Sequence, residues 1–214
     1  RGEWDGPRHH GKKFGGGMIR HSHHPPSFGR PEKHDGRRLH LRGPGQAHRS
    51  FKAPLTLDAD AAYFVSFLLE KSEEEDENGE NNGLGSHASV VLRPQGPSPR
   101  SISLGVSSEG FPYVNHDGLS ASTATAVQSG TEYFFVAKIA AHREGPDEVF
   151  LRLYADGERI DSHEPGVWSV VGRPVDSDFP LEMVRIQTGA EGAFDVDEIR
   201  VGSSWEAVTQ FREQ

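Results

Sequence analysis

Short apolar segments recur along positions 38–201, and glycine, proline, asparagine or aspartate separates one from the next. Several segments alternate apolar with polar residues, as in Ser101–Val106, where Ile102, Leu104 and Val106 lie on one side of an extended chain. This pattern predicts many antiparallel strands joined by tight turns. It argues against a helical bundle and against alternating strand–helix–strand units.

Two longer segments, Ala61–Leu69 and Thr131–Ala140, are rich in aromatic and β-branched residues and lack strict alternation. Such segments are typical of strands that are buried on both faces, although a short buried helix is the alternative for Ala61–Leu69. Near the end of the chain, Ser203 precedes Glu206 at capping-box spacing. We therefore expect one or two helical turns there, which would dock Trp205 and Val208 on the strands.

The expected fold is an all-β, two-sheet antiparallel jelly-roll sandwich with a short C-terminal helical turn. Residues 1–37 are expected to form an irregular basic leader rich in His, Gly and Pro, and residues 38–214 to form the sandwich. Residues 1–52 carry a net charge of +8, whereas residues 53–214 carry −17. The leader could bind a polyanion or pack across an acidic sandwich, its own or a neighbour's, and packing is the favoured interpretation.

Several classes of site are missing from the sequence. The absence of cysteine excludes disulfides, thiol catalysis and cysteine-ligated zinc. No apolar run approaches the length needed to span a bilayer. There is no Ser-His-Asp set, no phosphate-binding glycine loop and no zinc-protease helix, so the sequence predicts that the protein is not an enzyme.

Four segments occur together in an order that is familiar: Tyr63–Leu69, Ser103–Gly110, Gly130–Lys138 and Phe194–Gly202. In this order they resemble the concanavalin A-like lectin/glucanase superfamily, in the laminin G-like form found in exported bacterial proteins, those of planctomycetes among them. The resemblance implies a jelly roll and a secreted or cell-surface location. It implies function only weakly, because the fold hosts lectins, adhesion modules, glycosidases and lyases.

The favoured interpretation is a non-catalytic binding or adhesion module whose partner is a glycan or another protein surface, with copies of itself included and nucleic acid excluded. One alternative is a structural subunit of an extracellular filament or surface assembly, with the basic leader docked on a neighbouring sandwich. The other is a glycoside hydrolase or lyase that uses Asp195 and Asp197, which have the i, i+2 spacing of paired carboxylates. Their neighbours lack the glucanase pattern, so a solvent-facing or backbone-bonding role is expected for both.

A carbohydrate site needs an aromatic platform beside hydrogen-bonding side chains. The candidate ligand-binding residues are Tyr113, Asn115, His116 and Trp168. Tyr113 and Asn115 are preferred because they point to the same side of a strand that ends in a loop.

No cofactor is predicted to be required, and two weak metal sites are considered. Calcium, the usual metal of laminin G-like folds, would use Glu75, Asp76, Asn78 and Glu80, although an acidic run of this kind is more often a solvated loop. A transition metal would use His21, His23 and His24, although adventitious binding to a surface cluster is the favoured interpretation.

Overall fold

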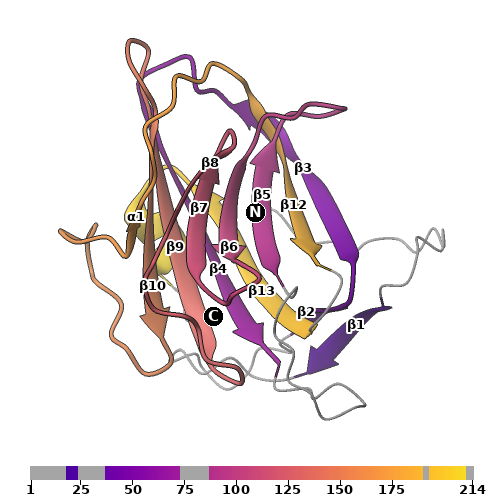
Figure 1. The fold of residues 1–214 in the computed structure, drawn as a ribbon. Coiled ribbons are helices and arrows are strands. Elements are labelled where there is room, and N and C mark those ends of the chain that lie inside the picture. The colour runs from indigo at the N-terminus through magenta and orange to yellow at the C-terminus, as the bar shows by residue number, and fades with distance from the viewer. Residues whose placement is uncertain (1–17, 24–36, 73–86, 190–192, 211–214) are drawn as a thin grey trace.

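The computed structural model describes residues 18–23, 37–72, 87–189 and 193–210, which form two antiparallel sheets packed face to face with one short helix. Figure 1 shows the two sheets as layers, with the helix at one side. The predicted all-β, two-sheet sandwich is confirmed.

The described residues supply seven strands to one sheet and six to the other. In spatial order, the seven-stranded sheet contains β1 (Met18–His23), β2 (Arg37–Arg42), β13 (Ala193–Gly202), β4 (Ala61–Lys71), β9 (Glu132–Ala141), β10 (Glu148–Ala155) and β11 (Val170–Val171). The six-stranded sheet contains β3 (Gly45–Leu55), β12 (Leu181–Thr188), β5 (Ala88–Arg93), β6 (Ile102–Val106), β7 (Pro112–His116) and β8 (Leu119–Ser122).

The two longest apolar segments became the neighbouring strands β4 and β9 in the middle of the seven-stranded sheet. Residues 64–69 of β4 are all buried, so the prediction of a strand with two buried faces is confirmed. One face of β4, with Phe67, lies in the main core between the sheets, where its ring stacks on Phe135 at 4.9 Å between centroids. The other face, with Phe64 and Leu68, lies in a second apolar cluster outside the sandwich.

The helix α1 (Trp205–Thr209) completes that second cluster. Trp205 and Val208 are buried on the outer face of the seven-stranded sheet, as predicted. The predicted N-cap is wrong by one residue, because Ser204 rather than Ser203 accepts the hydrogen bond from the backbone N–H of Ala207. The capping residue has to be the one directly before the first helical residue, and that residue is Trp205.

Two short strands were not predicted. Met18–His23 lies within the segment expected to be irregular, yet it pairs antiparallel with β2 and forms an edge strand, so that expectation is wrong for these six residues. Val170–Val171 pairs with β10 in a segment expected to be a connection. Both are edge strands that depend on hydrogen bonds to a partner strand, which the hydrophobic pattern of the sequence does not record. The division of the chain at residue 37 stays a prediction.

In the described part of the chain, no helix has the length and apolar character needed to cross a membrane.

Candidate functional site

The outer face of the six-stranded sheet carries the candidate site. Residues alternate along its strands, apart from a register shift between Leu181 and Met183 of β12, so that Val90 of β5 points into the core while Ser89 and Val91 point outward. The pairing registers align these outward residues across the whole sheet in two rows. One row contains Gln46, Gln187, Ser89, Gly105, Tyr113 and Ser122. The next row contains His48, Arg185, Val91, Ser103, Asn115 and Ser120. We call this surface the open face.

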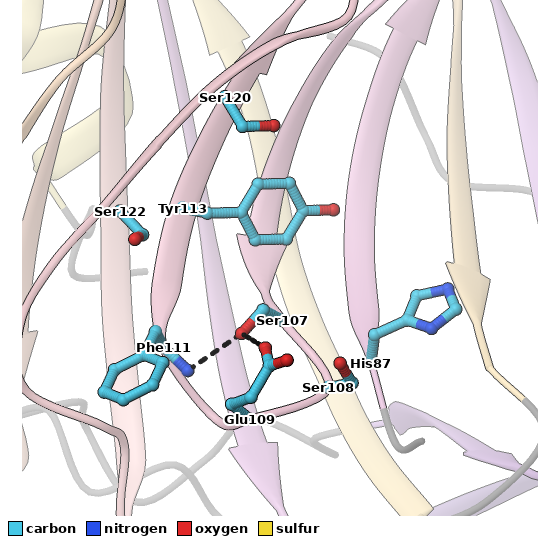
Figure 2. Close-up of a pocket in the computed structure, with 8 residues that line it drawn as sticks. All are labelled: His87, Ser107, Ser108, Glu109, Phe111, Tyr113, Ser120 and Ser122. Carbon is cyan, nitrogen blue, oxygen red and sulfur yellow. Dashed lines mark hydrogen bonds between the residues drawn. The ribbon is translucent and has the colours of Figure 1, made fainter. Parts of the chain in front are cut away.

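Tyr113 lies on the open face beside Gly105, a position that has no side chain. It pairs with Gly105 of β6, and a Cβ atom at Gly105 would stand 2.0 Å from the carbonyl oxygen of Ala88. Only glycine permits this close approach of β5 to β6, and the ring of Tyr113 extends across the face toward β5 (Figure 2). Burial raises the pKa of the Tyr113 phenol, and the Ser89 hydroxyl lowers it by a smaller amount. The phenol therefore keeps its proton at neutral pH and is available as a donor.

A pocket of about 350 Å³ adjoins Tyr113 at one end of the open face. Its wall is formed by the β6–β7 turn, and its other members are His87, directly before β5, and residues of β7 and β8 (Figure 2). The lining residues are His87, Ser107, Ser108, Glu109, Phe111, Tyr113, Ser120 and Ser122. The predicted turn at Ser107–Gly110 is thus confirmed, and it forms part of the site.

Hydrogen bonds hold this turn. The Ser107 hydroxyl donates to Oε2 of Glu109 at 3.0 Å and accepts from the backbone N–H of Phe111 at 3.2 Å. A backbone N–H and the Ser107 hydroxyl lower the pKa of the exposed Glu109 carboxyl. The pocket wall therefore carries a negative charge at neutral pH.

Arg185 supplies a positive charge on the β12 side of the open face. Its Nε is buried without a hydrogen-bond partner among the described residues. Burial lowers the pKa of Arg185, and so does the charge of Arg93, yet an arginine stays protonated in a protein. Arg93 is satisfied differently, since its Nη2 donates to the carbonyl oxygens of Gly96 at 2.8 Å and Ser98 at 2.7 Å.

The structure does not bring the four predicted ligand-binding residues together. Tyr113 and Asn115 share the open face, but the Asn115 amide holds the β7–β8 turn by donating to Oγ of Ser120 at 2.6 Å and accepting from the N–H of Gly118 at 3.1 Å. His116 points to the opposite side of the same strand and is fully buried. Alternation along β7 separates odd from even positions, so Asn115 and His116 cannot face the same ligand.

Trp168 belongs to the other side of the molecule. It packs at 5.5 Å from Phe150 and 6.0 Å from Trp205, measured between ring centroids, in the cluster under α1. Ligand binding by any of the four residues stays a prediction. Sequence reasoning also missed Arg185 and Gln187, although the alternation in Leu181–Thr188 already placed Met183, Arg185 and Gln187 on one side.

The predicted carboxylate pair Asp195 and Asp197 lies on β13 of the seven-stranded sheet, and each member is engaged by a neighbour. Oδ1 of Asp195 is 2.8 Å from Nδ1 of His40, and Oδ1 of Asp197 accepts the backbone N–H of Glu198 at 2.7 Å. Glu198 has φ of 52°, and the pairing of β13 with β4 shifts register here. The local backbone therefore uses Asp197, as the sequence led us to expect.

Most of the predicted metal ligands lie outside the described residues. Glu75, Asp76, Asn78, Glu80 and His24 fall outside the described residues, and His21 and His23 are described only as members of β1. Within the described ranges, no three His, Asp or Glu side chains gather as metal ligands. Calcium and transition-metal binding stay predictions.

No family model matches the chain, and no curated protein sequence matches it either. Solved structures do resemble it. An endo-β-1,4-glucuronan lyase from the fungus Trichoderma reesei matches with a TM-score of 0.51 and 13% identity, over 92% of this chain and 91% of that chain. An alginate lyase from Aplysia kurodai matches with a TM-score of 0.52 and 8% identity, over 86% of this chain and 87% of that chain.

At these identities the likeness shows the fold alone, a jelly-roll β-sandwich. It also corrects two predictions. The chain was expected to be a non-catalytic binding module and not an enzyme, yet both of these similar structures are polysaccharide-cleaving enzymes. The absence of a recognised catalytic motif misled the prediction, because residues on separate strands can form a site that no contiguous motif marks.

Proposed function

We propose that this protein is a polysaccharide lyase that cleaves a uronate-containing chain on the open face of the six-stranded sheet. One observation carries the proposal. Arg185, a permanent cation without an anionic partner among the described residues, shares this face with Tyr113, a phenol that keeps its proton. The two similar structures, a glucuronan lyase and an alginate lyase, support a uronate as the substrate.

The chemistry of a lyase asks for three groups. A cation neutralises the uronate carboxylate at C6, which makes the neighbouring C5 proton more acidic. A base removes that proton, the C5 electron pair forms a C4=C5 double bond, and the C4–O bond to the leaving sugar breaks. An acid then protonates the departing oxygen. The base gains one proton and the acid loses one, so the chain is cut without the addition of water.

The open face offers one residue for each task. Arg185 binds the carboxylate, for which its planar guanidinium is suited by two parallel hydrogen bonds. Tyr113 protonates the leaving oxygen, because its raised pKa keeps the phenol neutral. His87 accepts the C5 proton, since it lines the same pocket as Tyr113 and an imidazole is the side chain best suited to proton transfer near neutral pH.

The proposal includes a place of action outside the cell, because a large acidic polysaccharide of this kind is an extracellular polymer. Support comes from the predicted export and from the two lyases. A glycan as the partner follows directly from the proposed reaction. The narrower resemblance to laminin G-like domains of planctomycete-like proteins stays a prediction and carries no step of the mechanism.

The test is an assay of the purified chain on polyglucuronate, alginate and alternating uronate polymers, with the ultraviolet absorbance of the unsaturated product as readout. Tyr113→Phe removes only the hydroxyl, and we expect it to lower kcat by about 10²–10⁴-fold. The matched control is Tyr133→Phe on β9, whose hydroxyl accepts from the backbone N–H of Gln128 and lies on the other sheet.

Two further variants separate the roles. Arg185→Gln should raise KM and lower kcat, because it removes the charge that neutralises the carboxylate. His87→Gln should lower kcat, whereas His48→Gln, on the same face but outside the pocket, should change it little. A protein that yields no unsaturated product from any uronate polymer, or a Tyr113→Phe variant with full activity, would refute the proposal.

A further inference from the structure

We infer that Ser89 is a positioning residue for Tyr113: during the reaction its hydroxyl donates a hydrogen bond to the phenol oxygen, before and after Tyr113 gives up its proton. This role rests on the proposed function and adds a residue to the same site. Its basis is a buried hydroxyl that the fold leaves without a partner beside the proposed acid.

The side chain of Ser89 is buried within β5. The residue lies between Ala88 and Val90, points toward the open face and is 1% exposed. Its Oγ has no hydrogen-bond partner among the described residues. A buried hydroxyl without a partner lowers stability, so the fold alone would favour alanine at this position. The hydroxyl is therefore available to a partner that it meets only during the reaction.

Tyr113 faces Ser89 across a glycine. The pairing registers place Gly105 of β6 between Ser89 of β5 and Tyr113 of β7. Because Gly105 has no side chain, the ring of Tyr113 can extend over β6 toward β5, as Figure 2 shows. Two strand spacings, about 9–10 Å, separate β5 from β7, a distance that a tyrosine and a serine reaching toward each other can bridge.

The two hydroxyls are close without being bonded. The Ser89 hydroxyl lies near enough to the phenol to lower the pKa of Tyr113, yet its Oγ does not meet the distance and angle of a hydrogen bond. Hydrogen bonds of catalytic groups are often long in a free enzyme and shorten when the substrate binds. A small movement of the Tyr113 ring under a bound sugar would close this contact.

Ser89 also lies in the middle of the proposed site. His87, the proposed base, is two residues before Ser89 and lines the pocket together with Tyr113. On the opposite side, Gln187 of β12 pairs with Ser89, and Arg185 is two residues before Gln187 on the same face of the strand. The proposed base, acid and cation therefore occupy positions next to Ser89 or reach toward it.

The proton balance shows what this hydrogen bond does. While the phenol oxygen accepts from Ser89, its own proton is directed toward the substrate. Tyr113 then gives that proton to the C4 oxygen as the C4–O bond breaks, and the electron pair of its O–H bond stays on the phenolate oxygen. Ser89 keeps its proton and stabilises the phenolate, which burial alone would disfavour. The phenolate finally takes up a proton from water and the His87 imidazolium releases one, which restores the starting state.

The first test needs no substrate. Ultraviolet absorbance follows the ionisation of tyrosine, and the difference between the full chain and its Tyr113→Phe variant isolates Tyr113. Incorporation of 3-fluorotyrosine lowers the pH range of the titration, so that the chain stays folded. Ser89→Ala should raise the midpoint of Tyr113 by about one pH unit, because one hydrogen bond to the charged form is lost. It should not lower the free energy of unfolding.

Two variants control this measurement. Ser89→Thr keeps a hydroxyl on a residue that suits a strand, and it should restore most of the midpoint. Ser103→Ala removes a hydroxyl from the same face, on β6 and in the row next to that of Tyr113, and it should leave the midpoint unchanged.

The second test uses the lyase assay. Ser89→Ala should lower kcat about tenfold with little change in KM, because Ser89 acts on the acid and does not contact the substrate. The reaction needs a protonated phenol, so kcat falls as the pH rises through the pKa of Tyr113. Since Ser89→Ala raises that pKa, the alkaline limb of its kcat profile should move to higher pH.

The outcomes separate the two proposals. A shifted Tyr113 midpoint without cleavage of any uronate polymer would refute the lyase and sustain the hydrogen bond between the two side chains. Cleavage with an unchanged midpoint and unchanged kcat in Ser89→Ala would overturn the role of Ser89 and sustain the lyase. A Ser89→Ala variant that is destabilised, with an unchanged midpoint, would overturn it as well, because Ser89 would then be structural.

Discussion

The two outer faces of the sandwich are both built from alternating strands, but one is apolar and covered by a helix and the other is polar and uncovered. On the seven-stranded sheet, outward Phe64 and Leu68 are buried beneath α1, and the ring of Phe64 meets Trp205 edge to face at 6.3 Å between centroids. On the six-stranded sheet, the outward residues are mainly Gln, His, Ser, Arg and Tyr, and the pocket opens among them. An apolar outer face must be covered to be stable, whereas a polar one can remain available to a ligand.

The largest loss of stability is expected from removing the side chain by which α1 covers the seven-stranded sheet. Trp205→Ala deletes an indole that is 3% exposed and that donates its Nε1–H to the carbonyl oxygen of Asp161 at 2.9 Å. The free energy of unfolding should fall by about 3–5 kcal/mol, as for other large-to-small core substitutions. Denaturant unfolding followed by fluorescence measures it. A loss below about 1 kcal/mol would mean that α1 does not stabilise the covered face.

On the open face, a substitution that separates two strands should lower the unfolding free energy by less. Gly105→Ala places a Cβ 2.0 Å from the carbonyl oxygen of Ala88 and 2.7 Å from Cα of Ser89, which forces β5 and β6 apart. We expect a loss of about 1–3 kcal/mol in unfolding free energy, together with reduced activity from the displaced Tyr113. Gly166→Ala is the control, because its Cβ would meet no atom within 4 Å. Equal stability of the two variants would contradict the account of the floor beneath Tyr113.

Substitution of Arg185 is expected to have a smaller effect, which leaves stability unchanged or increases it. Arg185→Met removes a buried Nε that has no hydrogen-bond partner among the described residues, so the unfolding free energy should stay constant or rise by about 0.5–1 kcal/mol. Arg93→Met is the matched control and should lower the unfolding free energy by about 1–2 kcal/mol, because Arg93 donates to three carbonyl oxygens. Both changes are measured by denaturant unfolding. If Arg185→Met destabilised the protein as much as the control, Arg185 would be structural.

The smallest effect is the pH dependence of stability that the buried side chain of His116 should produce. Nε2 of His116 is 2.9 Å from Oγ of Ser177, which donates to Asp147 at 2.5 Å. Burial lowers the pKa of His116 below its usual value near 6.5, while Asp147 and Asp117 oppose the shift. The contribution of His116 to stability is therefore complete above pH 6.5 and declines as the pH falls through the lowered pKa, because the unfolded chain binds a proton first.

Unfolding free energies measured at pH values on both sides of 6.5 test this sign. His116→Asn removes the titrating group and should flatten the loss of stability on the acid side. A steeper acid loss in the variant than in the natural chain would show that His116 is charged in the folded protein.

The strands were largely predictable, because alternation and turn residues are local properties of the chain. Leu181–Thr188 was predicted with its observed bounds, and the two double-sided segments became β4 and β9. The edge strands β1 and β11 were not, since their pairing depends on distant partners. Within the candidate site, Tyr113 was recognised from its local surroundings. Arg185, which pairs with positions on two other strands, could not be related to it from the sequence.

The sequence by itself therefore determined the all-β class, most strand positions, the C-terminal helix and the alternation of neighbouring residues between the two faces of most strands, because these follow from a period of two and from local capping. Only the tertiary structure decided which outward residues share a face. Pairing registers join residues far apart in the chain, placing Tyr113 over Gly105 and Arg185 on the same surface, while α1 covers the opposite sheet. The choice between a buried aromatic cluster and an open polar face depends on that packing.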